Sequence, residues 1–168
     1  VPLFGPWSFS GQNAEIRNQG PSLLHWFGTD RFGRDLFTRV WYGAGISLTV
    51  GIVSAVTNGI IGVLYGAASG YAGGRTDMIL MRVADIVSAI PSMLYVILIT
   101  LVLGAGTVSI ILGLCIAGWI SMARIVRGEI IRLKGMEYTY AARMEGITSF
   151  RILMGHLLPK VAGTIVVN

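Results

Sequence analysis

Long apolar runs divided by short charged segments dominate this sequence. Between Arg39 and Arg75, and again between Asp85 and Arg124, there is no Asp, Glu, Lys or Arg. A helix needs about 20 apolar residues to cross the hydrocarbon core of a bilayer. The first gap is long enough for one such span, and the second is long enough for two. We therefore predict membrane spans at 46–70, 86–103 and 108–123, with a truncated fourth span from about residue 160.

Two local features refine these spans. A Gly-Ala-Gly-Thr turn at 104–107 makes the second and third spans a tight helical hairpin. Pro91 starts or kinks the second span, and we favour a packing kink over a gating hinge. Gly, Ala and Ser recur throughout the spans, which favours close packing against other helices. The predicted fold class is therefore all-α, a polytopic transmembrane helical bundle.

The composition agrees with a membrane protein. The chain is 54% hydrophobic and 12% charged, with a mean hydropathy of +0.70, whereas soluble domains carry about 25% charged residues. The formal net charge of +5 would suggest nucleic acid in a soluble chain, but basic loops facing the cytoplasm explain it here. The single cysteine, Cys115, lies in an apolar run and cannot by itself form a disulfide framework or a metal cluster. We expect no cofactor, no metal and no catalytic residue.

Basic residues set the orientation. Segments 71–85 and 124–160 carry nine Lys or Arg residues, against four in segments 1–45 and 104–107. The positive-inside rule therefore places 71–85 and 124–160 in the cytoplasm. Residues 1–45 then form an external segment, and residues 46–168 form the transmembrane domain. Both ends of the chain look cut, so we expect a fragment of a longer protein.

A polar helix–turn–helix at 136–158 lies between two apolar segments. Four residues share one face of its first helix at helical spacing: Met136, Tyr140, Ala141 and Met144. Gly146 is placed to end that helix in the left-handed conformation, and Thr148 can cap the second helix. Pro159 fits the first turn of the following membrane helix, where its missing N–H costs nothing.

A basic helix–turn–helix can also be a DNA-binding unit. Only Arg151 and His156 on the second helix could read bases, and the spans at both ends limit access to a major groove. His156 has no second His, Cys or carboxylate spaced to bind a metal with it. A membrane-anchored DNA-binding regulator therefore stays as the alternative from a different class of function.

The segment 140–159, YAARMEGITSFRILMGHLLP, resembles the EAA motif of bacterial ABC-importer permeases. That motif consists of Glu-Ala-Ala, three residues, Gly, nine residues and Ile-x-Leu-Pro. The matching positions are Ala141, Ala142, Gly146, Leu158 and Pro159. Tyr140 stands where the family has Glu, and His156 stands where it has Ile. The His-Leu-Leu-Pro ending is similar to the peptide-importer branch.

Two further segments resemble dipeptide/oligopeptide/nickel permeases of the OppC/DppC type. Residues 25–48 match the family pattern GTDxxGRDxxxRxxxGxRxSL, except that Gly45 stands where the family usually has Arg. Residues 73–97 fall where the family has a Gly-Gly turn, Asp, Met-Arg, Asp and Pro. The matching external positions are Gly28, Thr29, Asp30, Gly33, Arg34, Asp35 and Arg39. The three segments occur in the family's order and cover most of the chain.

This resemblance implies a MetI-like permease subunit of an ATP-driven peptide importer, in the plasma membrane of a bacterium or archaeon. The implied partners are a second permease subunit, two cytoplasmic ATPase subunits, an external solute-binding protein and the lipid bilayer, without nucleic acid. The residues that would couple to an ATPase are Tyr140, Ala141, Ala142, Gly146 and Ile147. The charges between Gly28 and Arg39 favour a solvated, self-paired elbow, with a latch for the external gate or for binding-protein docking as the alternative.

The spans lack the signs of an energy source within this chain. They contain no ionisable residue that would indicate proton or sodium coupling. No Gly-rich phosphate loop followed by Lys-Ser/Thr occurs in the sequence. We therefore expect a transport subunit and not an enzyme, with ATP hydrolysed on separate subunits. Nickel or another small solute stays open as the substrate, because a binding protein and a shared pathway would set it.

Overall fold

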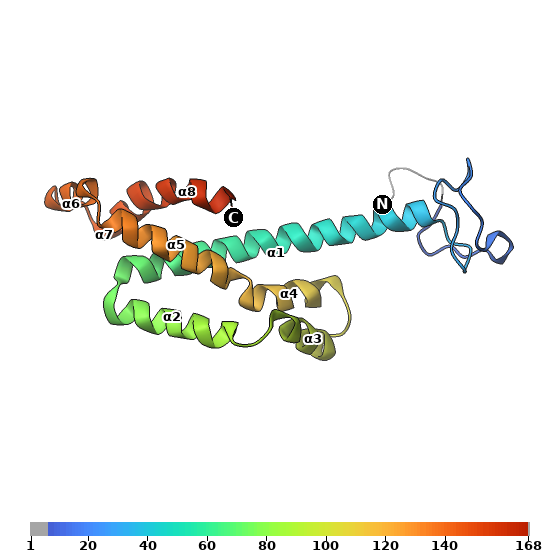
Figure 1. Ribbon diagram of the computed structural model, residues 1–168, viewed down its shortest axis with the longest axis horizontal. Helices are drawn as coiled ribbons and strands as arrows, with labels where there is room; N and C mark the ends of the chain where they lie inside the picture. The colour runs from blue at the N-terminus through green and yellow to red at the C-terminus, as the bar shows by residue number, and fades with distance from the viewer. Residues whose placement is uncertain (1–6, 168) are drawn as a thin grey trace. The chain divides into compact units, whose positions relative to one another are not determined.

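The computed structural model describes residues 7–167, apart from the side chains of residues 143, 149, 150, 156, 162 and 164–167. Helices make up most of this part of the chain (Figure 1). They are α1 (Leu36–Ala72), α2 (Gly74–Ser88), α3 (Ser92–Leu103), α4 (Thr107–Ala117), α5 (Trp119–Lys134), α6 (Glu137–Met144), α7 (Ser149–Ile152) and α8 (Leu158–Val167). A 3-10 turn η1 (Ala14–Ile16) and a π-helical turn η2 (Leu153–Leu157) complete the set. The predicted all-α class is confirmed.

The chain forms two compact units, residues 1–51 and 52–168. We call them unit 1 and unit 2, and α1 contributes residues to both. Unit 1 contains the loops before α1 and the first turns of that helix. Unit 2 contains the rest of α1 and all of the later helices.

Among the described residues, two helical stretches are long and apolar enough to cross a membrane. One is α1, with 37 residues, and the other is the nearly continuous stretch Thr107–Lys134, with 28. Both extend beyond the predicted spans, because α1 begins at Leu36 and the later stretch ends at Lys134. A third stretch qualifies only if the bent pair α2 and α3 counts as one span. Which residues lie inside the bilayer stays a prediction.

The span expected over 86–103 is divided between two helices at Pro91, the residue predicted to start or kink it. α2 ends at Ser88, α3 begins at Ser92, and the pair bends by 70°. Pro91 explains the break, because its ring clashes with the preceding turn and it has no N–H to donate. It also disfavours helical backbone at the residue before it. The 12 residues of α3 cover only about 18 Å at 1.5 Å per residue, which is too short for a separate span.

α3 and α4 form the hairpin that the Gly-Ala-Gly-Thr turn predicted. Gly104 takes a left-handed φ of 88° at the end of α3. The Ser109 hydroxyl donates to the Gly104 carbonyl at 2.7 Å, which holds the start of α4 against the turn. Gly113 lets the two helices approach closely, because a Cβ there would lie 2.5 Å from the Cα of Val96.

A stripe of glycines joins α1 to α5 within unit 2. Gly62, Gly66 and Gly70 recur every four residues, so they lie on one face of α1. A Cβ on Gly66 would clash with the carbonyl of Ala123, and one on Gly70 would lie 2.8 Å from the carbonyl oxygen of Arg127. The backbones of α1 and α5 therefore touch. This is the close packing that small residues allow between membrane helices.

A charged cluster ties three helices together at the end of this stripe. The guanidinium of Arg127 on α5 donates to both carboxylate oxygens of Asp77 on α2, at 2.5 and 2.6 Å. Ser69 on α1 donates to the same carboxylate at 2.5 Å. Lys134 donates to the carbonyl of Tyr71 at 2.5 Å and fixes the end of α5 to the end of α1. α1, α2 and α5 therefore form a firm base for the helices that follow.

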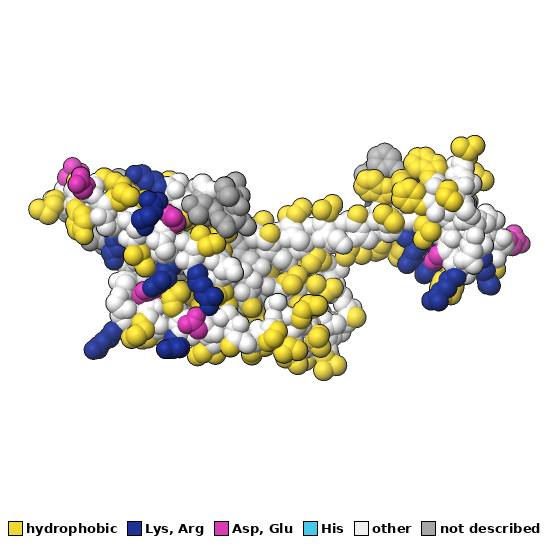
Figure 2. Space-filling model, in the orientation of Figure 1, with side chains coloured by type: hydrophobic (Ala, Val, Ile, Leu, Met, Phe, Trp, Pro, Cys, Tyr) yellow, Lys and Arg dark blue, Asp and Glu magenta, His cyan; other side chains and the backbone are white. Residues whose placement is uncertain are grey.

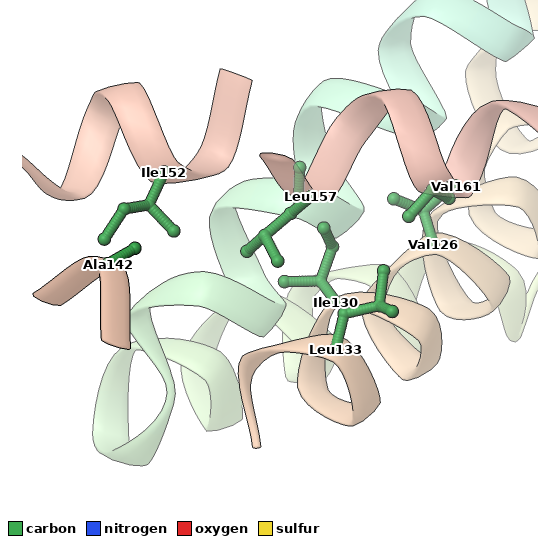
Figure 3. Packing of buried hydrophobic residues seen from close by; sticks show 8 residues of the cluster. Val126, Ile130, Leu133, Ala142, Ile152, Leu157 and Val161 are labelled. Atoms are coloured by element: carbon green, nitrogen blue, oxygen red, sulfur yellow. The ribbon is translucent and has the colours of Figure 1, made fainter. Parts of the chain in front are cut away.

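Figure 3 shows the core of unit 2, where α5 packs against the C-terminal helices. Its buried members are Ala67, Val126, Ile130, Leu133, Ala142, Ile152, Leu157 and Val161. Figure 2 shows that Lys and Arg side chains of unit 2 gather where α2 begins, α5 ends and α6 lies, whereas the α3–α4 hairpin is mostly hydrophobic. The core therefore lies directly beneath the charged end of this unit.

Candidate functional site

The chain turns sharply between α5 and α6. Gly135 follows the last residue of α5, and its N–H bonds to the Arg132 carbonyl at 3.3 Å. Thr139 then packs into the turn with 1% of its surface exposed, and its hydroxyl donates to the Leu133 carbonyl at 2.9 Å. The same carbonyl also accepts the Met136 N–H at 3.2 Å, so two bonds from the following turn converge on the end of α5. The start of α6 is thereby fixed to the end of α5.

α6 has a buried side and an exposed side. Thr139 and Ala142 point into the chain's own core, with 1% and 7% exposed. Glu137, Tyr140, Ala141 and Met144 are exposed on this helix, as is Met136 just before it. We call the members without charge the α6 ridge: Met136, Tyr140, Ala141 and Met144. Their exposure rises along the helix to 57% at Tyr140 and 89% at Met144. An apolar ridge left uncovered on a short, well-anchored helix is suited to contact a partner, and methionine adapts readily to such surfaces.

Gly146 ends α6 with a left-handed φ of 77°. The Ile147 N–H bonds to the Ala142 carbonyl at 3.1 Å, which is the long bond of a Schellman motif. Ala142 and Ile147 also meet in the hydrophobic core, the apolar contact that accompanies this motif. The spacing from Ala142 to Ile147 is therefore explained by helix termination alone.

A π-helical turn gives the last helices a common buried face. Ile152 is 1% exposed, and Leu157 and Val161 are fully buried. In an α-helix a spacing of five residues turns by about 140°, so Ile152 and Leu157 could not both face the core. The wider turn η2 (Leu153–Leu157) brings them to the same side. Pro159 lies in the first turn of α8, as predicted.

This arrangement does not suit the DNA-binding alternative. α7 has only four residues before η2 begins, and Ile152 and Leu157 in this region are turned into the core. Arg151 is exposed, but the His156 side chain lies outside the described residues. No recognition helix therefore stands free in this part of the chain.

The segment that we predict to be external is an elbow built around two glycines in unit 1. Thr29 and Asp35 form an isolated antiparallel bridge, and Gly28 and Gly33 take φ values of 75° and 69°. A Cβ at either glycine would also clash with a carbonyl of the preceding loop. These two glycines of the predicted motif are therefore required by the local backbone.

Asp35 caps the start of α1 from inside this elbow. One carboxylate oxygen accepts the Thr38 N–H at 2.7 Å, and the other lies 2.9 Å from the His25 ring nitrogen Nδ1. His25 and Asp35 are both 5% exposed. Burial alone would raise the pKa of Asp35, but the hydrogen bonds from Thr38 and His25 outweigh it and hold the pKa below its usual value.

The remaining charges of the elbow also find partners within unit 1. Asp30 accepts the Arg34 Nε–H at 2.7 Å, together with the N–H groups of Phe32 and Arg34. Arg39 donates to the Phe9 carbonyl at 3.3 Å and lies 4.0 Å from Asp30. This pairing supports the self-paired elbow over the latch.

Comparison with known proteins identifies the family. The family described as "Binding-protein-dependent transport system inner membrane component" matches residues 60–168. The chain belongs to this family. It is therefore a multi-pass inner-membrane protein, which agrees with its long apolar helices.

The chain is also similar to three curated transport proteins. It is 47% identical, over its full length and 55% of the relative, to the oligopeptide transport system permease protein OppC of Bacillus subtilis (strain 168). It is 46% identical, over 99% of this chain and 52% of the relative, to the dipeptide transport system permease protein DppC of the same organism. The glutathione transport system permease protein GsiD of Pectobacterium atrosepticum is 38% identical over 89% of this chain and 50% of the relative. The chain thus spans about half the length of the curated relatives it matches.

The predicted resemblance to OppC/DppC-type permeases is confirmed. Of the five residues predicted to couple to an ATPase, Tyr140 and Ala141 are exposed on the α6 ridge, while Gly146 shapes the turn. Ala142 and Ile147 instead serve the chain's own core and helix end. The helical spacing in the sequence predicted that the ridge residues share a face. It did not predict the buried role of Thr139, because a polar residue gives no signal in a hydrophobic pattern.

Among residues 7–167 with described side chains, no three His, Cys, Asp or Glu residues come together as metal ligands. Asp35 and His25 form a pair without a third such group, and Asp77 is held by Arg127. These two groups are therefore accounted for by helix capping and by ion pairing.

Proposed function

We propose that this chain is part of a permease subunit of an ATP-driven importer that carries peptides across the inner membrane. Family membership supports a transport role, and two relatives carry oligopeptide and dipeptide transport in their names. The complete importer would contain a second permease subunit, two cytoplasmic ATPase subunits and an external solute-binding protein. ATP would be hydrolysed on those separate ATPase subunits.

The observation that carries this proposal is the exposed α6 ridge on a firmly held helix. Tyr140 and Met144 are 57% and 89% exposed, although the opposite side of the same short helix is buried. In the orientation that the basic residues predict, this ridge faces the cytoplasm. We infer that the ridge fits into a groove on an ATPase subunit, in the way that an amphipathic helix binds a hydrophobic groove.

The base beneath the ridge provides a route for mechanical coupling. Thr139 fixes α6 to α5, and the Asp77–Arg127 pair fixes α5 to α2. The glycine stripe holds α5 against α1. A displacement of α6 by closing ATPases would therefore move α1, α2 and α5 together, as rigid bodies that alternate between inward-open and outward-open states.

The substrate is proposed at the level of peptides. A relative named for glutathione transport belongs to the same set of similar proteins, and nickel or another small solute remains the alternative. The solute-binding protein would contribute to substrate selection, and so would the pathway that this chain shares with the partner permease.

The proposal is tested by placing charge on the ridge. In the full-length permease, Tyr140→Asp combined with Met144→Asp should leave membrane insertion and thermal stability unchanged, because both side chains are exposed. Co-purification with the ATPase subunits and peptide uptake should each fall at least tenfold, since buried unpaired charges at an interface cost about 2–5 kcal/mol. Arg132→Ala on α5, which removes an exposed side chain, is the matched control. Normal assembly and uptake in the double variant would refute the docking role.

A further inference from the structure

Six aromatic side chains surround the first turns of α1 in unit 1. Ring contacts at centroid distances of 4.0–6.2 Å connect them in two groups. We call the set the aromatic collar: Phe9, Trp26, Phe27, Phe37, Trp41 and Tyr42. Phe37 meets the loop rings of Trp26 and Phe27, and it also meets the ring of Trp41 one helical turn on, while Phe9 stacks on Tyr42. Loop residues and helix residues therefore contribute to both groups.

The collar remains exposed although its rings contact one another. Trp26 is 60% exposed, Phe27 53% and Trp41 54%. The neighbouring Leu23 and Leu24 are 96% and 73% exposed. Soluble proteins rarely leave so large a contiguous apolar surface in water without a partner. On the visible face of unit 1 in Figure 2, hydrophobic side chains gather on one side, and Lys and Arg side chains gather toward the opposite edge.

The collar lies where the charges of α1 end. Arg39 is the last charged residue before a charge-free stretch that continues to residue 74. Tyr42 and Trp41 lie four and five residues before the predicted start of the hydrocarbon span at residue 46, which is about 6 and 7.5 Å along a helix. The headgroup layer on each side of a bilayer is about 5–7 Å thick. Tyr42 therefore falls within that layer and Trp41 at its outer edge, where Trp and Tyr are enriched in membrane proteins.

We propose that the aromatic collar is a lipid-binding surface that anchors the external elbow in the outer headgroup layer of the bilayer. This inference rests on the proposed orientation and on the predicted span that begins at residue 46. Trp and Tyr combine an apolar ring with a polar tip, which suits a layer that is apolar on one side and wet on the other. The collar is also continuous with exposed apolar residues farther along α1 within unit 1, namely Val40, Ile46 and Leu48.

The polar groups of the elbow are compatible with this position. Asp30 is paired with Arg34, and Asp35 is paired with His25 and capped by Thr38, so the acidic groups near the collar are already satisfied. Arg39 donates to a carbonyl of the collar residue Phe9. These paired acidic groups therefore do not oppose insertion of the collar into the headgroup layer. Arginine in that layer is favourable, because its guanidinium can reach lipid phosphates.

A spin label measures where the collar lies. The full-length permease would carry one new cysteine after Cys115 and any other reactive cysteine of the transporter are replaced by alanine. It would be assembled with its transporter subunits and reconstituted in phosphatidylcholine nanodiscs. The test variant is Phe27→Cys in the collar, and the control is Glu15→Cys, an exposed residue of η1. Because Phe27→Cys removes a ring contact, Leu24→Cys provides a second test position with 73% exposure.

We expect the labels at 27 and 24 to collide several times more often with oxygen than with a water-soluble relaxation agent, relative to the label at 15. The result should not change when the solute-binding protein is added. Equal access of the water-soluble agent to all three labels would overturn the proposal. Protection of 27 and 24 only after the binding protein is added would also overturn it, and would assign the collar to protein docking. The outcome is independent of peptide uptake, so a failure of the transport proposal is recognised separately.

Discussion

Gly146 offers the sharpest test of how α6 is positioned. Its φ of 77° lies in the left-handed region, and the space around an added Cβ is empty for at least 4 Å. Any cost of substitution therefore comes from the backbone conformation and not from a clash. That conformation costs about 1–2 kcal/mol for an L-residue. Replacing glycine also restricts the unfolded chain, which stabilises the folded state by about 0.4–1 kcal/mol. Gly146→Ala should therefore destabilise the end of α6 by about 1 kcal/mol, and Gly146→Val by more.

Gly128 on α5 provides a matched control. An added Cβ there also meets no atom within 4 Å, but its backbone is that of an ordinary helix interior. Gly128→Ala should stabilise the helix by about 0.5–1 kcal/mol. The two alanine substitutions thus add the same methyl group in equally open space and should have opposite signs.

The local effect can be read by hydrogen exchange in the full-length transporter. The Ile147 amide, which bonds to the Ala142 carbonyl, should exchange about fivefold faster in Gly146→Ala, as 1 kcal/mol predicts. Gly146→Val should also lower peptide uptake per ATP hydrolysed, because the α6 ridge would no longer be held in one position. Unchanged exchange and unchanged coupling in both Gly146 variants would refute the assigned role of this turn.

Two further predictions concern ion pairs. Asp77→Asn should lower the free energy of unfolding by about 2 kcal/mol, because it leaves the partly buried Arg127 without its carboxylate. Asp85→Asn should lower it by less than about 1 kcal/mol, because the pair of Asp85 with Arg124 is half exposed. Thermal unfolding in detergent compares the two variants, and equal losses would contradict a stabilising role for the Asp77–Arg127 pair. The lowered pKa of Asp35 stabilises unit 1 above the unfolded value of about 3.9, and this stability is lost as the pH falls through the folded pKa. Tryptophan fluorescence should therefore report a transition of the elbow below about pH 4, absent in Asp35→Asn.

The hydrophobic pattern predicted most of the helices, and the features that it missed have physical causes. Charge-free gaps located α1 and the α3–α4 hairpin, because a helix in lipid must be apolar over its whole length. The span expected over 86–103 is broken at Pro91, the residue that the sequence predicted would start or kink it. Apolarity did not predict that α2 begins at Gly74, because the segment 71–85 carries charges. The bidentate pair of Asp77 and Arg127 joins residues 50 positions apart, which no local pattern predicts.

The residues predicted to contact an ATPase have two different structural roles. Ala142 and Ile147 belong to the helix-ending motif and the core, whereas Tyr140 and Ala141 lie on the surface. Periodicity could not make this division, because it shows which residues share a face and not which face is covered. The π-helical turn was also missed, since only the packing of Ile152 with Leu157 reveals the need for it.

Photo-crosslinking from position 140 tests the central claim most directly. A photoreactive phenylalanine analogue in place of Tyr140 has a similar shape and lies on the exposed α6 ridge. In membranes containing the complete transporter, it should crosslink to an ATPase subunit, and the same analogue at Met93, an exposed position on α3, should not. Crosslinks to lipid alone, or equal crosslinking from both positions, would contradict the assignment of this ridge as the contact with the ATPase.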